Sequence, residues 1–457
     1  MGDPFLCTAP SLGKQFKVLL YNIHGIALVK KGLKVFQIQK NLYRWQERYG
    51  LGMEQRTEHI GEMAIILARD DKGLVTVFGI PAARRLVLLA LQLGLKEIHI
   101  IGQVKSLRPV LSDLLPLERF HPVDNAASLG QVVERLALPA QQRVLVLKAN
   151  HVIDRSSLTR LIEAGDHSGL YFMETKESGT ERIYLTSSPD LVSILQHLWF
   201  SSSHLSLPDK AQSVRGAEGL PYILNGGEER AKIAEDALIK ASASQTKEED
   251  GFLARHVNRR ISRFFSRSLA HTTATPNQIT MVGVIIGMTG AVLFSRPGYW
   301  CHLIGSLLFL FCTIVDGVDG EVARLKLQET IFGHYLDVIT DNIVHVAIFA
   351  GIALGLYHDS GDPVYFRILW VSVGGFGLCG IAVYQCISRR SREELRRSVY
   401  TIKIMAMLSS RDFAYIVVAL ALAQRLQWFL IGAAIGTYLF AVTLWMISYY
   451  EKKVVAD

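Results

Sequence analysis

The chain has 457 residues, 50% of them hydrophobic, and a formal net charge of +8. This length excludes a single ordinary domain. The five cysteines include no C-x-x-C spacing, which argues against a disulfide framework and against a zinc site. The positive charge is compatible with nucleic acid, an anionic membrane or a phosphorylated substrate. The basic residues lie beside apolar runs, so we expect one of the last two and no nucleic-acid partner.

Residues 1–240 are expected to form a cytoplasmic α/β domain. Short apolar runs typical of strands alternate with amphipathic patterns typical of helices, which predicts a mostly parallel, doubly wound sheet. The predicted strands begin at Lys17, Met63, Glu97 and Arg143, and the predicted helices begin at Pro81 and Ser156. The first residues lack a basic segment followed by an apolar core and a cleavage site, so we expect no secretory signal.

Residues 241–270 are expected to be a linker and a juxtamembrane helix. The run SASQTKEEDG from Ser242 is polar and has no hydrophobic face. From Phe252 to Leu269, apolar residues lie close to one helical stripe and arginines lie largely elsewhere. This pattern predicts a basic amphipathic helix on an anionic leaflet. An ordinary solvated helix packed on the first domain is the alternative.

Residues 271–457 are expected to form an all-α transmembrane domain of six helices. Roughly 20 apolar residues cross a bilayer. Six apolar runs approach this length, at 278–295, 299–315, 333–357, 368–388, 413–424 and 428–448, the fifth of them short. Most basic loop residues fall on the side of the first domain. We therefore expect an integral protein of the cell inner membrane, with the N-terminal domain and the active site facing the cytoplasm.

Four aspartates lie near the ends of the second and third predicted membrane helices. Asp316 and Asp319 share one face of the second helix, and Asp337 and Asp341 share one face of the third. Two facing helices would bring four carboxylates together, and cations would relieve their mutual repulsion. Carboxylate oxygens suit Mg²⁺ or Mn²⁺, and two such ions can hold a pyrophosphate. The sequence therefore predicts a site for two divalent ions.

The spacing D-x2-D-G-x2-A-R-x8-G-x3-D-x3-D resembles the signature of the CDP-alcohol phosphotransferases, also called CDP-alcohol phosphatidyltransferases. All eight fixed positions are matched, by Asp316, Asp319, Gly320, Ala323, Arg324, Gly333, Asp337 and Asp341. The run ATPNQIT also resembles the Pro-Asn-x-x-Thr element of this family, with Pro276, Asn277 and Thr280 at its fixed positions. The resemblance covers about residues 250–457.

This resemblance implies an enzyme of phospholipid biosynthesis that transfers the phosphoryl-linked group of a CDP-alcohol to an acceptor alcohol and releases CMP. It implies CDP-diacylglycerol as the donor, contact with membrane lipid and a homodimer. The metal ligands would be Asp316, Asp319, Asp337 and Asp341, and Asp341 would also be the general base. The CDP moiety would be surrounded by Asn277, Thr280, Gly320, Ala323, Arg324 and Gly333.

The basic run SRRSREELRR from Ser388 has two interpretations. The first is a solvated charged face that sets the membrane topology. The second is a site for an acceptor phosphate, formed by Arg389, Arg390 and Arg411. The second interpretation implies a phosphorylated acceptor, such as inositol phosphate or glycerol phosphate.

The first domain resembles the sugar-phosphate nucleotidyltransferase fold, on the runs GIPAARRLVLLALQLGLKEIHIIG from Gly79 and RVLVLKANHVID from Arg143. It departs from an active version in two places. The Gly-rich phosphate loop is replaced by ILARDDKGLVTV from Ile66, and a metal-binding Gly-Asp step is replaced by Asn150 and His151. These losses predict a degenerate, structural or regulatory domain. An active cytidylyltransferase is the alternative.

Three other functions stay open. A synthase that joins a polar CDP-alcohol such as CDP-inositol to a soluble alcohol would use the same chemistry. An ion or proton transporter would also place carboxylates in a membrane, although the sequence has no internal repeat and no charges spaced across the bilayer depth. A catalytically inactive membrane scaffold is the third.

Overall fold

The computed structural model describes residues 62–95, 97–125, 127–139, 142–164, 169–175, 182–187, 190–200, 211–217, 220–245, 254–388 and 412–456. The chain divides into two compact units, Met1–Ile60 and Gly61–Asp457, and all described residues belong to the second unit. Some predictions fall outside the described residues: the strand from Lys17, most of the polar linker, and the arginines Arg389, Arg390 and Arg411.

The first part of the described chain is an α/β domain, as the sequence predicts. Its sheet has the strand order β10-β8-β9-β6-β1-β4-β5. The strands are β1 (Glu62–Ala68), β4 (Glu97–Gly102), β5 (Phe120–Pro122), β6 (Arg143–Lys148), β8 (Tyr171–Glu174), β9 (Arg182–Ser187) and β10 (Gln212–Ser213). Strand β1 runs parallel to both β4 and β6, whereas β9 runs antiparallel to β6 and β8. The three predicted strands within the described residues all lie in this sheet.

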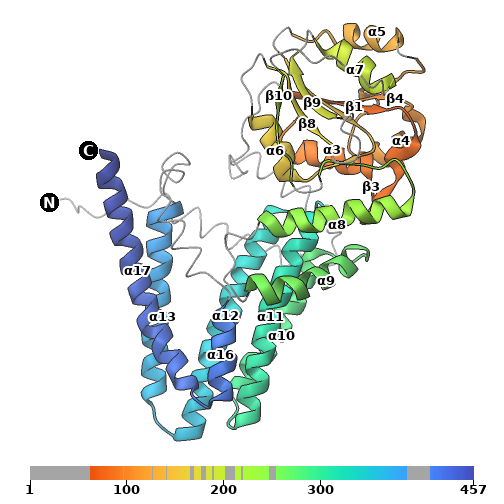
Figure 1. Ribbon diagram of the computed structural model, residues 1–457. Helices are drawn as coiled ribbons and strands as arrows, with labels where there is room; N and C mark the ends of the chain where they lie inside the picture. Colours follow the sequence, from red (N-terminus) through yellow and green to blue (C-terminus); the bar gives the residue numbers. More distant parts are fainter. Residues whose placement is uncertain are drawn as a thin grey trace, which may run out of the picture. The chain divides into compact units, whose positions relative to one another are not determined.

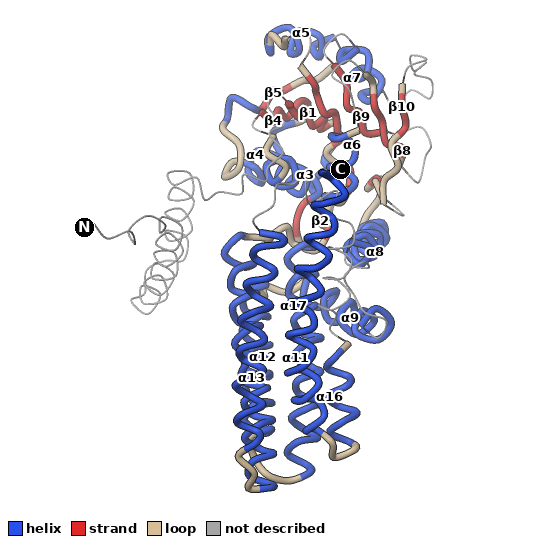
Figure 2. Tube along the Cα trace, turned by 90° about the vertical axis from the view of Figure 1, so that its left-hand side faces the viewer, coloured by secondary structure: helices blue, strands red, loops and turns tan. Residues whose placement is uncertain are grey.

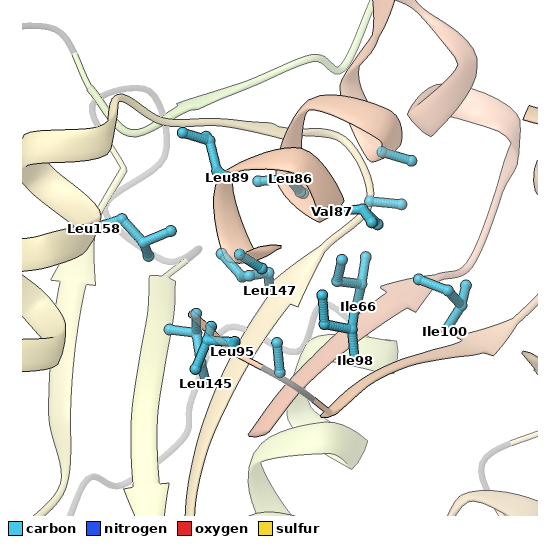
Figure 3. Close-up of a cluster of buried hydrophobic side chains, with 14 of the residues drawn as sticks. Ile66, Leu86, Val87, Leu89, Leu95, Ile98, Ile100, Leu145, Leu147 and Leu158 are labelled. Atoms are coloured by element: carbon cyan, nitrogen blue, oxygen red, sulfur yellow. The ribbon is translucent and has the colours of Figure 1, made fainter. Parts of the chain in front are cut away.

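Two layers of helices cover the sheet. Helices α3 (Ala82–Gln92), α4 (Val104–Leu111) and α6 (Arg155–Glu163) pack on one face, and α5 (Ala127–Leu136) and α7 (Leu191–Phe200) pack on the other (Figure 1). Successive strand residues point to opposite faces, so Ile66 joins the first core and Ile65 joins the second. Figure 3 shows Leu86 of α3 above Ile66, Ile98 and Leu147 in the first core.

Two two-stranded ribbons and two further helices connect the domain to the apolar helices. The ribbons pair β2 (Thr76–Val77) with β3 (Ile80–Pro81) and β7 (His151–Val152) with β11 (Tyr222–Ile223). The helices are α8 (Glu228–Gln245) and α9 (Arg259–Ala270). One buried apolar cluster contains Phe78, Ala234 of α8, Ala270 of α9 and Leu325, so it spans these elements continuously.

The second part of the chain is helical. Among the described residues, five helices are long and apolar enough to cross a membrane by length and composition. They are α10 (Pro276–Phe294), α11 (Tyr299–Leu325), α12 (Ile331–Ser360), α13 (Val364–Val383) and α17 (Leu426–Ala456). The fifth predicted run forms α16 (Phe413–Leu422), which is shorter than a span. Within the part of the chain that the structure describes, the six predicted spans therefore correspond to five long helices and one short one.

Close backbone contact holds the apolar helices together. A Cβ atom built on Gly355 of α12 would lie 2.0 Å from the carbonyl oxygen of Phe294, which ends α10. Only a residue without a side chain allows this approach. Helices α13 and α17 run side by side in Figures 1 and 2, and the Cys379 thiol of α13 donates to the carbonyl oxygen of Thr437 at 3.0 Å.

Candidate active site

Three of the four predicted metal ligands meet between two helices. Asp316 and Asp319 lie on α11 and Asp337 lies on α12, and each offers a carboxylate oxygen within 4.8 Å of the others'. Asp319 is buried, with 5% of its surface exposed, and the other two are half-buried. Asp341, one helical turn beyond Asp337, is not a member of this group among the described residues. The arrangement thus separates three clustered carboxylates from a fourth nearby.

A short turn fixes the two helices relative to each other. Helix α11 ends at Leu325 and α12 begins at Ile331. Leu327 has a positive φ of 54°, and the Gln328 amide donates to the carbonyl oxygen of Ala323 at 2.8 Å, which closes the last turn of α11. Thr330 caps α12, because its hydroxyl oxygen accepts from the Gly333 amide at 2.9 Å. These local bonds place the aspartates of both helices on facing sides.

The buried carboxylate of Asp319 accepts hydrogen bonds on both oxygens. The Thr280 hydroxyl of α10 donates to Oδ2, and the Gly320 amide donates to Oδ1 at 2.5 Å. Thr275 caps the start of α10 in a reciprocal capping box. The Thr275 hydroxyl accepts from the backbone amide of Gln278, and the Gln278 side-chain oxygen accepts from the backbone amide of Thr275. The Pro-Asn-x-x-Thr element is therefore placed directly beside the acidic cluster.

Other predicted CDP-binding residues lie at the same place. A Cβ atom built on Gly333 would lie 3.2 Å from the side-chain oxygen of Asn277, so these two residues face each other across α10 and α12. A Cβ atom on Gly320 would lie 3.4 Å from Nη1 of Arg324. Ala323 is half-buried on the same helix. The structure brings all six predicted CDP-binding positions onto the three helices that surround the aspartates.

The acidic cluster is suited to a hard divalent cation. Its donor set consists of carboxylate oxygens from three residues, which are the ligands that Mg²⁺ and Mn²⁺ prefer. No thiol or imidazole belongs to the group among the described residues. The residues present therefore fit a site for such an ion.

Glu321 was not a predicted site residue, although it directly follows Gly320 in the motif. It lies on the face of α11 that packs against α9, and it is 3% exposed. Its carboxylate accepts from Arg259 Nη1 at 2.8 Å, Ser262 Oγ at 2.9 Å and Ser266 Oγ at 2.7 Å. A carboxylate inside an apolar run, together with serines four residues apart in the preceding helix, is the signal that could have revealed this pairing.

Two further contacts were also missing from the sequence predictions. Arg324 Nε donates to the Ser242 hydroxyl of α8 at 2.9 Å. The Lys326 ammonium donates to the carbonyl oxygens of Thr272 and Ala274 at 2.7 and 2.9 Å, and burial lowers its pKa. Both contacts join segments more than 50 residues apart, so no local pattern indicates them.

The α/β domain has a small polar pocket at the carboxyl ends of β1 and β6. Its lining includes Arg69, Lys72, Lys148 and Asn150. His151, at the position where the resemblance expects a metal-binding aspartate, is fully buried and its Nδ1 accepts from the Lys148 amide at 3.2 Å. Burial, and then the charge of Lys148, lower the pKa of His151 to about 3. This position thus holds a neutral imidazole that is bonded to the backbone.

Comparison with known families decides what the helical part is. Residues 273–449 match the family model of the CDP-alcohol phosphatidyltransferases. These residues form a CDP-alcohol phosphatidyltransferase domain. The transferase domain contains all eight motif positions and the Pro-Asn-x-x-Thr element, so the recognition from sequence is confirmed.

Relatives of known name are transferases of this kind. The bifunctional IPC transferase and DIPP synthase of Thermococcus kodakarensis is 32% identical over 190 residues, which are 41% of this chain and 40% of that protein. The CDP-diacylglycerol–glycerol-3-phosphate 3-phosphatidyltransferase of Blochmanniella floridana is 26% identical over 183 residues, which are 39% of this chain and 90% of that protein. The chain spans less than half the length of the bifunctional relatives that it matches.

Solved structures with low sequence identity are similar to portions of the chain. The phosphatidylinositol phosphate synthase of Mycobacterium tuberculosis with CDP-DAG bound is 20% identical, covers 42% of this chain and 92% of its own, and has a TM-score of 0.28. The 4-diphosphocytidyl-2C-methyl-D-erythritol synthase of Anaerococcus prevotii is 14% identical, covers 39% of this chain and 97% of its own, and also has a TM-score of 0.28.

Proposed function

We propose that the protein is an integral membrane enzyme that transfers the phosphoryl-linked group of a CDP-alcohol to a second alcohol and releases CMP. The observation that carries this proposal is the meeting of Asp316, Asp319 and Asp337 from two helices inside the eight-position motif. Isolated aspartates near helix ends are usually solvated caps, whereas carboxylates clustered within an apolar bundle mark a functional site. The transferase domain supplies the reaction class.

The three clustered carboxylates would hold Mg²⁺ or Mn²⁺, because these ions prefer hard oxygen ligands. Asp341 would be the general base or share an ion. Two such ions, when bound, would neutralise the pyrophosphate and stabilise the leaving phosphate. The Asn277 amide, the Thr280 hydroxyl and the small residues Gly320, Ala323 and Gly333 would surround the CDP moiety. Arg324 offers a planar fork of donors that suits a phosphate.

The chemical step is a displacement at the β-phosphorus of the CDP-alcohol. The acceptor hydroxyl gives its proton to the Asp341 carboxylate as its oxygen forms a bond to this phosphorus. The bond between the β-phosphorus and the bridging oxygen breaks, and the electron pair leaves with CMP. Asp341 lies on α12 one helical turn beyond Asp337, so an alcohol that approaches the clustered carboxylates would also come close to the Asp341 carboxylate.

For the donor we propose CDP-diacylglycerol, since the Blochmanniella relative is named for this donor. A phosphorylated acceptor would engage Arg389, Arg390 and Arg411. The apolar helices favour a lipid product that stays in the membrane. A homodimer in the cell inner membrane, with the active site and the α/β domain on the cytoplasmic side, belongs to the same proposal.

A second candidate is a synthase that uses a polar donor such as CDP-inositol. The observation that favours it is the α/β domain that precedes the transferase domain in the chain, together with the naming of the Thermococcus relative as both an IPC transferase and a DIPP synthase. In this case a water-soluble nucleotide would be the donor and the membrane helices would only hold the site.

The deciding assay uses the full-length protein purified in lipid nanodiscs with Mg²⁺. CMP release is measured with CDP-diacylglycerol and with CDP-inositol, each against a panel that contains glycerol 3-phosphate, inositol phosphate and inositol. Mass spectrometry then identifies the product. Turnover with only the lipidic donor supports the first proposal, and turnover with only CDP-inositol supports the second. Ion flux in proteoliposomes without CMP release from any pair would instead indicate a transporter.

A further inference from the structure

The turn between the two aspartate-bearing helices is bonded to the α/β domain. The Arg85 guanidinium of α3 donates from Nη1 to the carbonyl oxygen of Leu325 at 2.7 Å, and the Gln92 amide, two turns farther along α3, donates to the carbonyl oxygen of Leu327 at 3.0 Å. The last carbonyls of a helix have no partner within that helix. Helix α3 supplies a partner for the last carbonyl of α11, that of Leu325, and for the carbonyl of Leu327 in the turn that follows.

The Arg85 contact is buried and therefore costly to lose. Arg85 is 3% exposed, and its Nη1 also lies 3.5 Å from the carbonyl oxygen of Val77. A buried guanidinium must be hydrogen-bonded, because its desolvation is otherwise uncompensated. The pKa of Arg85 is lowered to about 10 by burial, against the opposing effect of Glu235, so the group stays charged at neutral pH. The end of α11 is thus part of the environment that accommodates this charge.

A third bond reaches a motif residue directly. The Ser242 hydroxyl of α8 is buried and accepts from Nε of Arg324 at 2.9 Å. An arginine held through Nε keeps its two terminal nitrogens for other partners. Ser242 therefore sets the direction of the guanidinium that faces Gly320.

We propose that Arg85, Gln92 and Ser242 are positioning residues of the acidic site. None of them lies within residues 273–449. Arg85 and Gln92 fix the turn that sets the separation of Asp319 from Asp337, and Ser242 orients Arg324. The α/β domain then contributes no reacting group and is still needed for full activity. The part of this inference that concerns turnover rests on the proposed function, whereas the part that concerns the turn does not.

The first experiment measures amide hydrogen exchange over residues 326–334 in the full-length protein without substrate. In Arg85→Gln and Gln92→Leu we expect exchange in this segment to become about tenfold faster, the effect of losing one hydrogen bond to a backbone carbonyl. Arg85→Lys keeps a charged donor and should restore part of the protection. Arg84→Gln is the matched control, since Arg84 lies on the same helix but pairs with Asp113 of its own domain. We expect wild-type exchange in this control.

Unchanged exchange over 326–334 in both Arg85→Gln and Gln92→Leu would overturn the inference. Gln92 is only half-buried, so Gln92→Leu decides the question if Arg85→Gln does not fold. Mn²⁺ titration of the same samples adds a second readout. We expect several-fold weaker Mn²⁺ binding in the two variants and wild-type binding in Arg84→Gln.

The last experiment tests Ser242→Ala by steady-state kinetics with the donor that the wild type accepts. We expect a several-fold higher KM for the CDP-alcohol and a smaller change in kcat, because Arg324 would be oriented less firmly toward the phosphates. Equal KM values for variant and wild type would exclude Ser242 as a positioning residue. Absence of CMP release by the wild type with every donor would contradict the proposed function. The hydrogen-exchange test of the turn would remain valid in that case.

Discussion

Thr280 of α10 donates its hydroxyl hydrogen to Oδ2 of Asp319, the most deeply buried of the three clustered carboxylates. Groups that bond to a metal ligand orient it, and their loss commonly lowers metal affinity or activity about 10–100-fold. We expect a loss of this size in Thr280→Val, measured as Mn²⁺ affinity and as kcat. Thr289→Val is the control, since Thr289 lies exposed on the same helix and donates to the carbonyl oxygen of Ile285. Wild-type Mn²⁺ affinity in Thr280→Val would show that this bond has no such role.

Substitutions of Asp341 and Asp319 should have different effects on turnover and on Mn²⁺ binding. Asp341→Asn removes the proposed base, so we expect turnover to fall about 10²–10⁴-fold. Because Asp341 is outside the three-carboxylate cluster, Mn²⁺ binding should persist in this variant. Asp319→Asn should lose both turnover and Mn²⁺ binding. Titration of Mn²⁺ alone separates the two roles, and equal loss of binding in both variants would make Asp341 a ligand.

Glu321 should matter for stability more than any exposed ion pair. Glu321→Leu leaves Arg259, Ser262 and Ser266 without their shared acceptor, and removing one partner of a buried ion pair typically costs about 3–5 kcal/mol. We expect a clear drop in the denaturant midpoint of the protein in detergent. Asp236→Asn is the matched control, because Asp236 pairs with Arg267 of the same helix α9 at 2.7 Å and both side chains are exposed. Its effect should stay below about 1 kcal/mol.

The contact between Gly355 and the end of α10 predicts that no side chain larger than a hydrogen atom fits at position 355. Gly355→Ala would place a methyl group 2.0 Å from the carbonyl oxygen of Phe294, so α12 or α10 must shift. Overpacking of this kind costs about 1–3 kcal/mol. Gly436→Ala on α17 has nothing within 4 Å of the added atom and should be neutral or stabilising. Thermal denaturation of both variants in one detergent provides the comparison, and equal midpoints would contradict the close approach.

The buried His151 predicts a dependence of stability on pH. Its pKa in the folded protein is lowered to about 3, from an ordinary value near 6.5, chiefly by burial. The unfolded chain therefore binds more protons between these values, so this group favours folding above pH 6.5 and that contribution is lost as the pH falls toward 3. In His151→Gln we expect a smaller drop of the thermal midpoint between pH 7.5 and pH 5. An unchanged drop would show that other groups govern the acid sensitivity.

The clustered aspartates could be predicted from the sequence, whereas the residues that hold their helices in place could not. Asp316, Asp319 and Asp337 could be predicted to meet because helical spacing places them on facing sides of consecutive helices. The six predicted CDP-binding positions follow from the same spacing and from the family resemblance. The bonds from Ser242 to Arg324 and from Arg85 to Leu325 join residues 82 and 240 positions apart, and only tertiary packing creates them.

The fold, too, was predictable only in part. Short, nearly continuous apolar runs predicted β1, β4 and β6, because each strand is buried on both faces of the sheet. The antiparallel strand β9 between β6 and β8 was not predicted, although the sequence between β8 and β9 contains Ser178-Gly179, a turn signal. Helix α16 ends at Leu422 because the chain turns there, with Gln424 at a positive φ of 55°.

The turn at 326–330 also limits how this protein can be divided for study. Only five residues separate the two aspartate-bearing helices, so any fragment that retains both must retain an unbroken α11 and α12. Protease cleavage within this turn would break the covalent link between Asp319 and Asp337, whereas an insertion there would only lengthen it.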